Sequence, residues 1–157
     1  MFKISIKPLF QCLSTVPRLV SIWQDVLGRR WLPGTCSSSL AKSISANISS
    51  TDLPITMVAL HDKKPVGMVT LSSKDGLESD LTPWLSDLVV CADYHGKGVG
   101  SSLMREAIDI TRLQGYDSLH LFTFDAHLPK YYKRFGWECI GKDTYKTHPV
   151  IIMKIRL

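Results

Sequence analysis

The segment LVVCADYHGKGVGSSLMREAI, residues 88–108, decides the fold. Its apolar start is typical of a buried strand, and three glycines, Gly96, Gly98 and Gly100, follow within five residues. Glycine is needed where the backbone turns with positive φ or where a ligand touches the main chain. The residues after the turn predict a helix, whose apolar face carries Val99, Leu103, Ala107 and Ile110.

The glycine turn is a candidate phosphate site. At the start of a helix the first backbone N–H groups have no partner within the helix, and the peptide dipoles place about half a positive charge there. Lys97 adds a full charge. The GxxxxGK loop is absent and a GxGxxG loop needs glycine where Ser101 stands, so neither nucleotide hydrolysis nor hydride transfer is indicated. The alternative is a tight turn that binds nothing.

Length and composition indicate one globular domain over residues 1–157. Apolar residues make up 45% of the chain and charged residues 21%, which excludes a disordered protein, and no stretch approaches the roughly 18 apolar residues of a membrane span. Residues 1–17 interrupt their apolar side chains with Lys, Pro and Gln, which predicts a strand in place of an export signal. We therefore expect a cytoplasmic protein without a membrane partner.

The charge pattern argues against a nucleic-acid-binding protein, and the cysteine pattern argues against a zinc or disulfide-bonded protein. The net charge is +5, but no run of Lys and Arg exceeds two residues and no aromatic residues alternate with them, so a smaller anion is a better partner than nucleic acid. The four cysteines form no CxxC pair and have no histidine at ligand spacing, which disfavours zinc and disulfides. We expect buried free thiols and no metal.

The chain alternates strands and helices in a way that predicts a mixed α/β sheet with helices packed on it. Residues 37–50 show no strong period, and their structure is left open between helix and loop. The elements expected elsewhere are a strand at 2–9, a helix at 18–28 ended by Gly28, a hairpin at 54–73 around residues 62–64, a strand at 84–92, a helix after the glycine turn, a strand at 118–124, a short helix at 128–135, a short strand at 136–141 and a last strand at 149–157.

Two segments of the chain resemble the GNAT N-acetyltransferase family. The turn His95-Gly96-Lys97-Gly98-Val99-Gly100 is similar to its motif A, Q/R-x-x-G-x-G/A after a central strand, with His95 in place of the usual Arg or Gln. The segment YYKRFGWE, residues 131–138, resembles a second family segment, with Tyr132 four residues before Gly136 and Trp137 in a phenylalanine position. The order of elements also matches the family over nearly the whole chain.

The resemblance implies a fold and an activity. The fold would be α/β, with a mixed, mostly antiparallel central sheet, two splayed parallel central strands at 85–90 and 118–124, and flanking helices. The activity would be direct transfer of an acetyl group from acetyl-coenzyme A to a primary amine of a small molecule or peptide, without a covalent enzyme intermediate. Tyr132 would be the general acid, because a phenol with a pKa of about 10 suits a thiolate leaving group.

The resemblance also implies where the cofactor lies. The main chain of Leu88, Val89 and Val90 would pair with the pantetheine amides, and an N–H near Val90 would polarise the thioester carbonyl. Asp125 stands where the family often has an asparagine that contacts the cofactor. The pyrophosphate would be held by the turn, that is by His95, Gly96, Lys97, Gly98, Val99, Gly100 and Ser101.

The general base and the acceptor stay open. A carboxylate or histidine can take the proton of the alkylamine, and the candidates are Glu78, Asp80, Asp87, His127 and His148. Asp75, Glu78, Asp80 and Asp87 fall on or just before the strand that, by the resemblance, lines the gap, so we expect a cationic acceptor. The alternative is that these carboxylates only solubilise a surface loop. A non-catalytic module that binds acyl-coenzyme A is the alternative function, and oligomeric state is not readable from the sequence.

Overall fold

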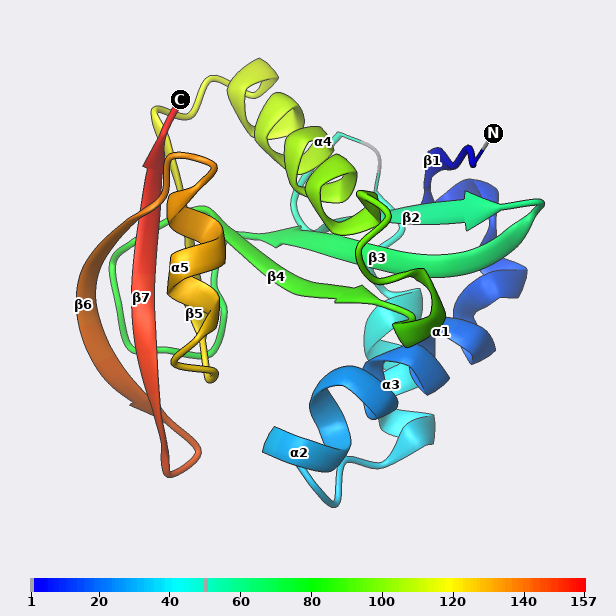
Figure 1. Cartoon of the computed structure of the whole chain (residues 1–157), viewed down its shortest axis with the longest axis horizontal. Coiled ribbons are helices and arrows are strands. Elements are labelled where there is room, and N and C mark those ends of the chain that lie inside the picture. Colours follow the sequence, from blue (N-terminus) through cyan, green and yellow to red (C-terminus); the bar gives the residue numbers. More distant parts are fainter. Residues whose placement is uncertain (1, 50) are drawn as a thin grey trace.

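A seven-stranded sheet in the order β1-β2-β3-β4-β5-β7-β6 runs through the molecule (Figure 1). The computed structural model describes residues 2–49 and 51–157. Neighbouring strands are antiparallel except β4 and β5, which are parallel, so the expected mixed and mostly antiparallel sheet is confirmed. The strands are β1 (Ser5–Pro8), β2 (Ile55–His61), β3 (Lys64–Ser72), β4 (Trp84–Val90), β5 (Ser118–Thr123), β6 (Glu138–Tyr145) and β7 (His148–Arg156).

Helices cover both faces of the sheet, and each face has its own apolar core. Alternate residues of a strand point to opposite faces, so Met57 and Ala59 pack in one core while Val58 and Leu60 pack in the other. The first core receives α4 and α5, and the second receives α1 and α3. The helices are α1 (Val16–Trp23), α2 (Arg29–Trp31), α3 (Ser37–Ser45), α4 (Val99–Leu113) and α5 (Leu128–Lys133). Within the described residues no helix is long and apolar enough to cross a membrane.

Three local expectations change in the structure. Gly28 does not end the first helix: a π-turn at Gln24–Gly28 continues into α2, because Gly28 keeps an ordinary helical φ of −61° and a Cβ there would collide with the Gln24 side chain. The segment left open contains α3. The strand expected at 136–141 extends as β6 to Tyr145, because the hairpin turn lies later, at Lys146 and Thr147, where φ is +46° and +72°.

The hairpin expected around residues 62–64 is present and turns in the same way. Asp62 and Lys63 have φ values of +49° and +67°. A two-residue hairpin turn needs positive φ at both residues to match the twist of the strands that it joins, here β2 and β3. The four cysteines are free, as expected, but the expectation that they are buried is wrong, since Cys12 and Cys91 are only partly buried. Cys36 and Cys139 are exposed.

The feature that positions the site is the parting of β4 from β5. The strands are joined at Trp84 and His120, where the His120 N–H also donates to the Pro83 carbonyl at 3.1 Å, and beyond this point they diverge. The β3–β4 ladder shifts register near Asp87, whose φ is +52°, so a bulge turns β4 further from β5. The expected splay of the two central strands is therefore present (Figure 1).

Helix α4 offers a matched test of the first core. Leu103 is fully buried and Leu113 is 87% exposed, although both are leucines of the same helix. We expect Leu103→Ala to lower the free energy of unfolding by about 2–5 kcal/mol, because it leaves a cavity between α4 and the sheet. Leu113→Ala should change it by less than about 0.5 kcal/mol. Urea denaturation followed by circular dichroism measures both, and equal losses would contradict this packing.

Candidate functional site

A groove of about 500 Å³ opens where β4 leaves β5, between the glycine turn and α5. The two sequence segments that resemble one family, the glycine turn and the Tyr132 segment, face each other across it. Its walls are formed by Leu88 and Val90 of β4, by Tyr94, His95, Gly96, Gly98, Val99, Gly100 and Ser101 of the turn and the start of α4, and by Leu128, Tyr131, Tyr132, Arg134 and Phe135.

The glycine turn leaves backbone donors at the start of α4. Gly98 is the N-cap residue with φ +84°, and no side chain caps this helix end. The Gly98 carbonyl accepts the first hydrogen bond of the helix from the Ser102 N–H at 3.0 Å. The N–H groups of residues 99–101 therefore precede the ladder of helical hydrogen bonds, and Gly100 and Ser101 place them at the groove.

His95 connects the turn to the end of β4. Its Nε2 lies 2.7 Å from the carbonyl oxygen of Val90, and since a carbonyl only accepts, this ring nitrogen donates. The contact spans five residues and holds the turn against the strand. Sequence patterns gave no sign of this bond, because it depends on the path of the chain through residues 91–94.

Tyr132 lies at the inner end of the groove. Its side chain is 8% exposed, and burial, followed by the neighbouring Tyr131, raises the pKa of its phenol above the ordinary value. Burial also raises the pKa of Tyr131. Both phenols are therefore protonated at neutral pH and can donate. Tyr132 also lines a second cavity on the other side of the site, and Tyr131 does not.

This second cavity, called here the aromatic cavity, lies between the C-terminal part of β5, the bulge of β4 and α2. It has a volume of about 160 Å³ and shares Leu88, Leu128 and Tyr132 with the groove. Sequence reasoning missed its aromatic walls, although the alternation of Phe122 and Phe124 along one strand was a usable signal. The aromatic and acidic side chains that line it are Trp23, Trp31, Phe122, Phe124, Tyr145, Asp75, Asp87 and Asp125.

Two carboxyl groups of the aromatic cavity have perturbed pKa values. Burial, and then the charge of Asp87, raise the pKa of Asp75 to about 8. Burial likewise raises the pKa of Asp87, and the Trp23 indole opposes this shift by donating from Nε1 to Oδ1 at 3.0 Å. The charge of Asp87 thus disfavours ionisation of Asp75, because both carboxyls line the same cavity.

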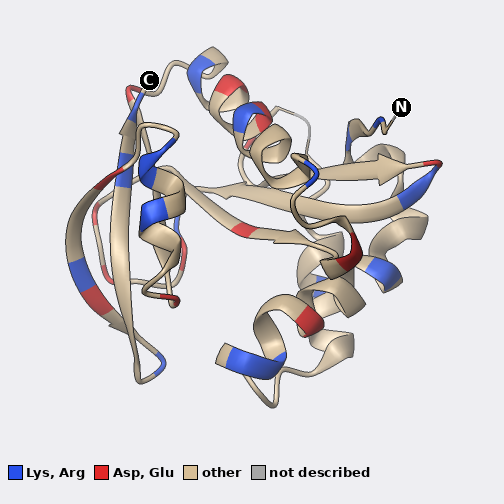
Figure 2. Ribbon diagram, viewed as in Figure 1, with Lys and Arg blue, Asp and Glu red and all other residues tan. Residues whose placement is uncertain are grey.

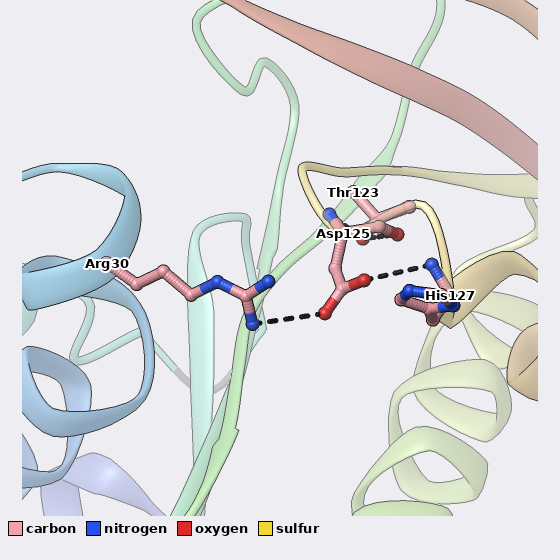
Figure 3. A network of polar contacts seen from close by, with 4 residues as sticks. All are labelled: Arg30, Thr123, Asp125 and His127. Atoms are coloured by element: carbon pink, nitrogen blue, oxygen red, sulfur yellow. Dashed lines mark hydrogen bonds and ion pairs between the residues drawn. The ribbon is translucent and has the colours of Figure 1, made fainter.

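Asp125 faces α2 and not the groove (Figure 3). Its Oδ2 lies 3.4 Å from Nη1 of Arg30, and its Oδ1 accepts from the His127 N–H at 2.9 Å. Arg30 also lies over the Trp31 ring, 4.6 Å from its centroid. The ion pair therefore fixes the helical end that carries Trp31 beside the end of β5.

The comparison with protein families decides the classification of the chain. The model of the acetyltransferase (GNAT) family matches residues 21–137. The chain belongs to the GNAT family. A curated relative, the uncharacterized N-acetyltransferase YjhQ of Escherichia coli (strain K12), is 32% identical over 95 residues, which are 58% of this GNAT chain and 50% of YjhQ. This chain thus spans about half the length of that relative.

Solved structures share the fold of this GNAT chain. A putative phosphinothricin N-acetyltransferase superposes with a TM-score of 0.78 at 18% identity, covering 99% of both chains. The PaiA N-acetyltransferase from Thermoplasma acidophilum, solved in complex with coenzyme A, gives 0.73 at 19% identity and 99% coverage of both. Aminoglycoside 6'-acetyltransferase type Ii gives 0.74 at 16%, covering 98% of this chain and 96% of the other.

Most cofactor residues expected in this GNAT chain line the groove, but three do not. Val89 is 1% exposed and packs in the core beneath α1, so only its main chain is near the groove. The Lys97 ammonium lies 5.2 Å from the centre of the Phe2 ring. Asp125 lines the aromatic cavity. Within residues 2–49 and 51–157, no group of three metal-ligating side chains is found.

The candidate general bases of this GNAT chain lie in different places. Asp87 lies in the aromatic cavity, whereas Glu78, Asp80 and His127 are exposed and line neither space. His148 packs edge-on against the Trp31 and Phe124 rings at 5.8 and 5.7 Å. Asp75, which the sequence offered only as part of an acidic stretch, is brought beside Asp87 by the loop between β3 and β4.

The raised pKa of Asp75 predicts a pH-dependent stability. Its folded-state pKa of about 8 exceeds the ordinary 3.8, so between these values the folded protein binds more protons than the unfolded chain. The free energy of unfolding should therefore fall as the pH rises from about 4 to 8. Asp75→Asn should flatten this slope, while the exposed control Asp80→Asn should keep it. Urea unfolding at several pH values measures the slope, and an unchanged slope in Asp75→Asn would contradict the assignment.

Proposed function

We propose that this GNAT protein is an N-acetyltransferase that moves an acetyl group from acetyl-coenzyme A directly to a primary amine of a small molecule or peptide. The observation that carries the proposal is the position of Tyr132, whose side chain forms part of the groove and part of the aromatic cavity. A thioester end in the groove and an amine in the cavity would meet at this residue. Family membership supports the same reaction class.

The glycine turn is proposed to hold the pyrophosphate of the cofactor. The N–H groups of residues 99–101 and the dipole of the 15-residue helix α4 favour an anion at this end. Arg134 lines the same groove, and Lys and Arg bands mark α5 beside it in Figure 2. Lys97, at the turn itself, can reach the anion by leaving the Phe2 ring, since a cation–π contact at an exposed site contributes only about 0.5–1 kcal/mol.

The parting of the strands is proposed to hold the pantetheine arm. Peptide groups alternate in direction along β4, and those between Leu88 and Val90 that do not pair with β3 face the side from which β5 has diverged, so amides of the arm can take the place of a neighbouring strand. The Val90 carbonyl already accepts from His95, which leaves the N–H on this side of Val90 for the arm. An N–H near Val90 then donates to the thioester carbonyl and stabilises the negative charge that forms there during attack.

The transfer uses Tyr132 as the general acid. The neutral amine attacks the thioester carbon, the C–N bond forms, and the C–S bond breaks as the phenol gives its proton to the sulfur. The attacking nitrogen becomes strongly acidic as it bonds to carbon, and its proton returns to the phenolate. Burial keeps the Tyr132 phenol protonated at neutral pH, but it also moves the pKa of the phenol away from that of a thiolate, so the match expected from the ordinary value of about 10 is weaker in the folded protein.

Replacing each tyrosine of the pair tests the assignment. Tyr132→Phe should lower kcat about 10²-fold or more with little change in coenzyme A affinity, because only the proton donor is lost. Tyr131→Phe is the matched control, since Tyr131 lines the groove and not the aromatic cavity, and it should have a much smaller effect. Thiol release with a panel of amines measures turnover. Coenzyme A binding without thiol release from any amine would favour the non-catalytic module.

A pair of glycines tests the pyrophosphate site. Gly98 and Gly34 have φ values of +84° and +86°, so alanine strains either backbone by a similar amount, and neither Cβ would meet a protein atom closer than 3.9 Å. Gly98 lines the groove and Gly34 does not. Gly98→Ala should weaken coenzyme A binding at least about 10-fold by calorimetry, whereas Gly34→Ala should leave it unchanged. Equal affinities would place the pyrophosphate elsewhere.

A further inference from the structure

We propose that the aromatic cavity is the acceptor site and that it takes a primary amine, in its ammonium form, attached to one flat apolar ring. Asp75 binds the ammonium group, and Asp87 removes a proton from it. This inference rests on the proposed acetyl transfer, because it names the amine and the base of that reaction. It narrows the broad class of cationic acceptors to amines whose ring fits a cavity of about 160 Å³.

The volume of the cavity sets the size of the acceptor. A cavity of about 160 Å³ is close to the engineered apolar cavity of about 150 Å³ that accepts benzene, so it suits a single ring. A long polyamine or a multi-ring aminoglycoside exceeds this space. The smaller size distinguishes the cavity from the groove, which has about 500 Å³ and suits an extended cofactor.

The walls of the cavity set the chemistry of the acceptor body. Trp31 and Phe124 stack at 5.5 Å with 14° between their planes, and Phe122 lies edge-on to Phe124 at 5.6 Å. The Tyr145 ring closes the same side, 5.2 Å from that of Phe122. Such a wall favours a flat apolar group, and its ring faces also attract a cation.

Two carboxyl groups set the charge of the acceptor. In the described part of the chain no hydrogen bond reaches the Asp75 carboxyl, and Asp87 receives one, on Oδ1 from Trp23. Both carboxyls have oxygens free to accept hydrogen bonds, and an ammonium between them favours their ionised forms through its charge and through charge-assisted hydrogen bonds. An anionic ligand would add to the repulsion instead. The third carboxyl of the cavity, that of Asp125, is already paired with the Arg30 guanidinium.

The position of Asp87 assigns it the role of base. The bulge of β4 places it directly before Leu88, which lines both the cavity and the groove, so its carboxyl is adjacent to the path of the amine toward the thioester. One proton passes from the ammonium to the Asp87 carboxylate, the neutral amine attacks, and the second proton reaches the sulfur through Tyr132. Asp87 then returns its proton to water. A carboxyl with a raised pKa is the better base for this step.

Ligand binding tests the acceptor class without requiring turnover. With coenzyme A present, calorimetry should detect 2-phenylethylamine at least about 10-fold more tightly than ethanolamine, which lacks the ring, and than 3-phenylpropionate, which reverses the charge. Trp31→Leu should reduce the preference over ethanolamine. Equal binding of the three ligands, or a preference for the anionic one, would overturn the proposal.

Isosteric variants test the two carboxyls. Asp87→Asn should lower kcat for 2-phenylethylamine about 10²-fold with little change in KM, and Asp75→Asn should mainly raise KM. Asp80→Asn, from the same loop but outside the cavity, is the matched control, and thermal unfolding verifies that all variants are folded. Normal kinetics in Asp87→Asn would refute its role as base while leaving acetyl transfer intact. Carboxyl-dependent binding without thiol release would refute acetyl transfer and the role of Asp87 as base, and would leave only a binding site for an aromatic amine.

Discussion

The site depends on backbone N–H and C=O groups of β4 and β5 that do not hydrogen-bond to each other. Backbone N–H and C=O groups need partners, and a sheet normally supplies them through the neighbouring strand. Here the ladder between β4 and β5 joins Trp84 to His120 and the strands then diverge, helped by the bulge at Asp87. The resulting gap is polar along β4 and has a helix start at its mouth, which suits a long ligand with amides along its length and an anion near one end.

The two side chains proposed as acid and base lie beside the same gap. Tyr132 and Asp87 both lie in poorly solvated surroundings, and burial raises the pKa of each. For the phenol this means that the proton is retained at neutral pH, and for the carboxyl it means a stronger attraction for a proton once ionised. One physical effect, the loss of solvation, thus favours the protonated form of both residues: it strengthens the Asp87 carboxylate as a base and weakens the Tyr132 phenol as an acid.

The sequence predicted those parts of the site whose requirements are local. Gly96 and Gly98, before α4, have positive φ values, which favour glycine. This requirement is local, so the glycines could be recognised in the sequence before the fold was known. The aromatic cavity is different, because Trp31, Asp75 and Phe124 come from three distant segments. Gly28 shows a limit of local reasoning: glycine often ends a helix, but here its small size admits the Gln24 side chain and the chain stays helical to Trp31.

Joining two half-sheets at so short a contact has a mechanical consequence. The strands β1–β4 and β5–β7 each form continuous antiparallel ladders, and between them Trp84 and His120 act as a hinge. Across the gap, α4 touches both halves, and its Met104 accepts from the Trp137 Nε1 at 3.3 Å through a polarisable sulfur. Rocking about the hinge breaks no rung of either ladder. Opening or closing the gap therefore costs fewer strand-to-strand hydrogen bonds than bending either half-sheet, and α4, which contacts both halves, is the element that opposes it.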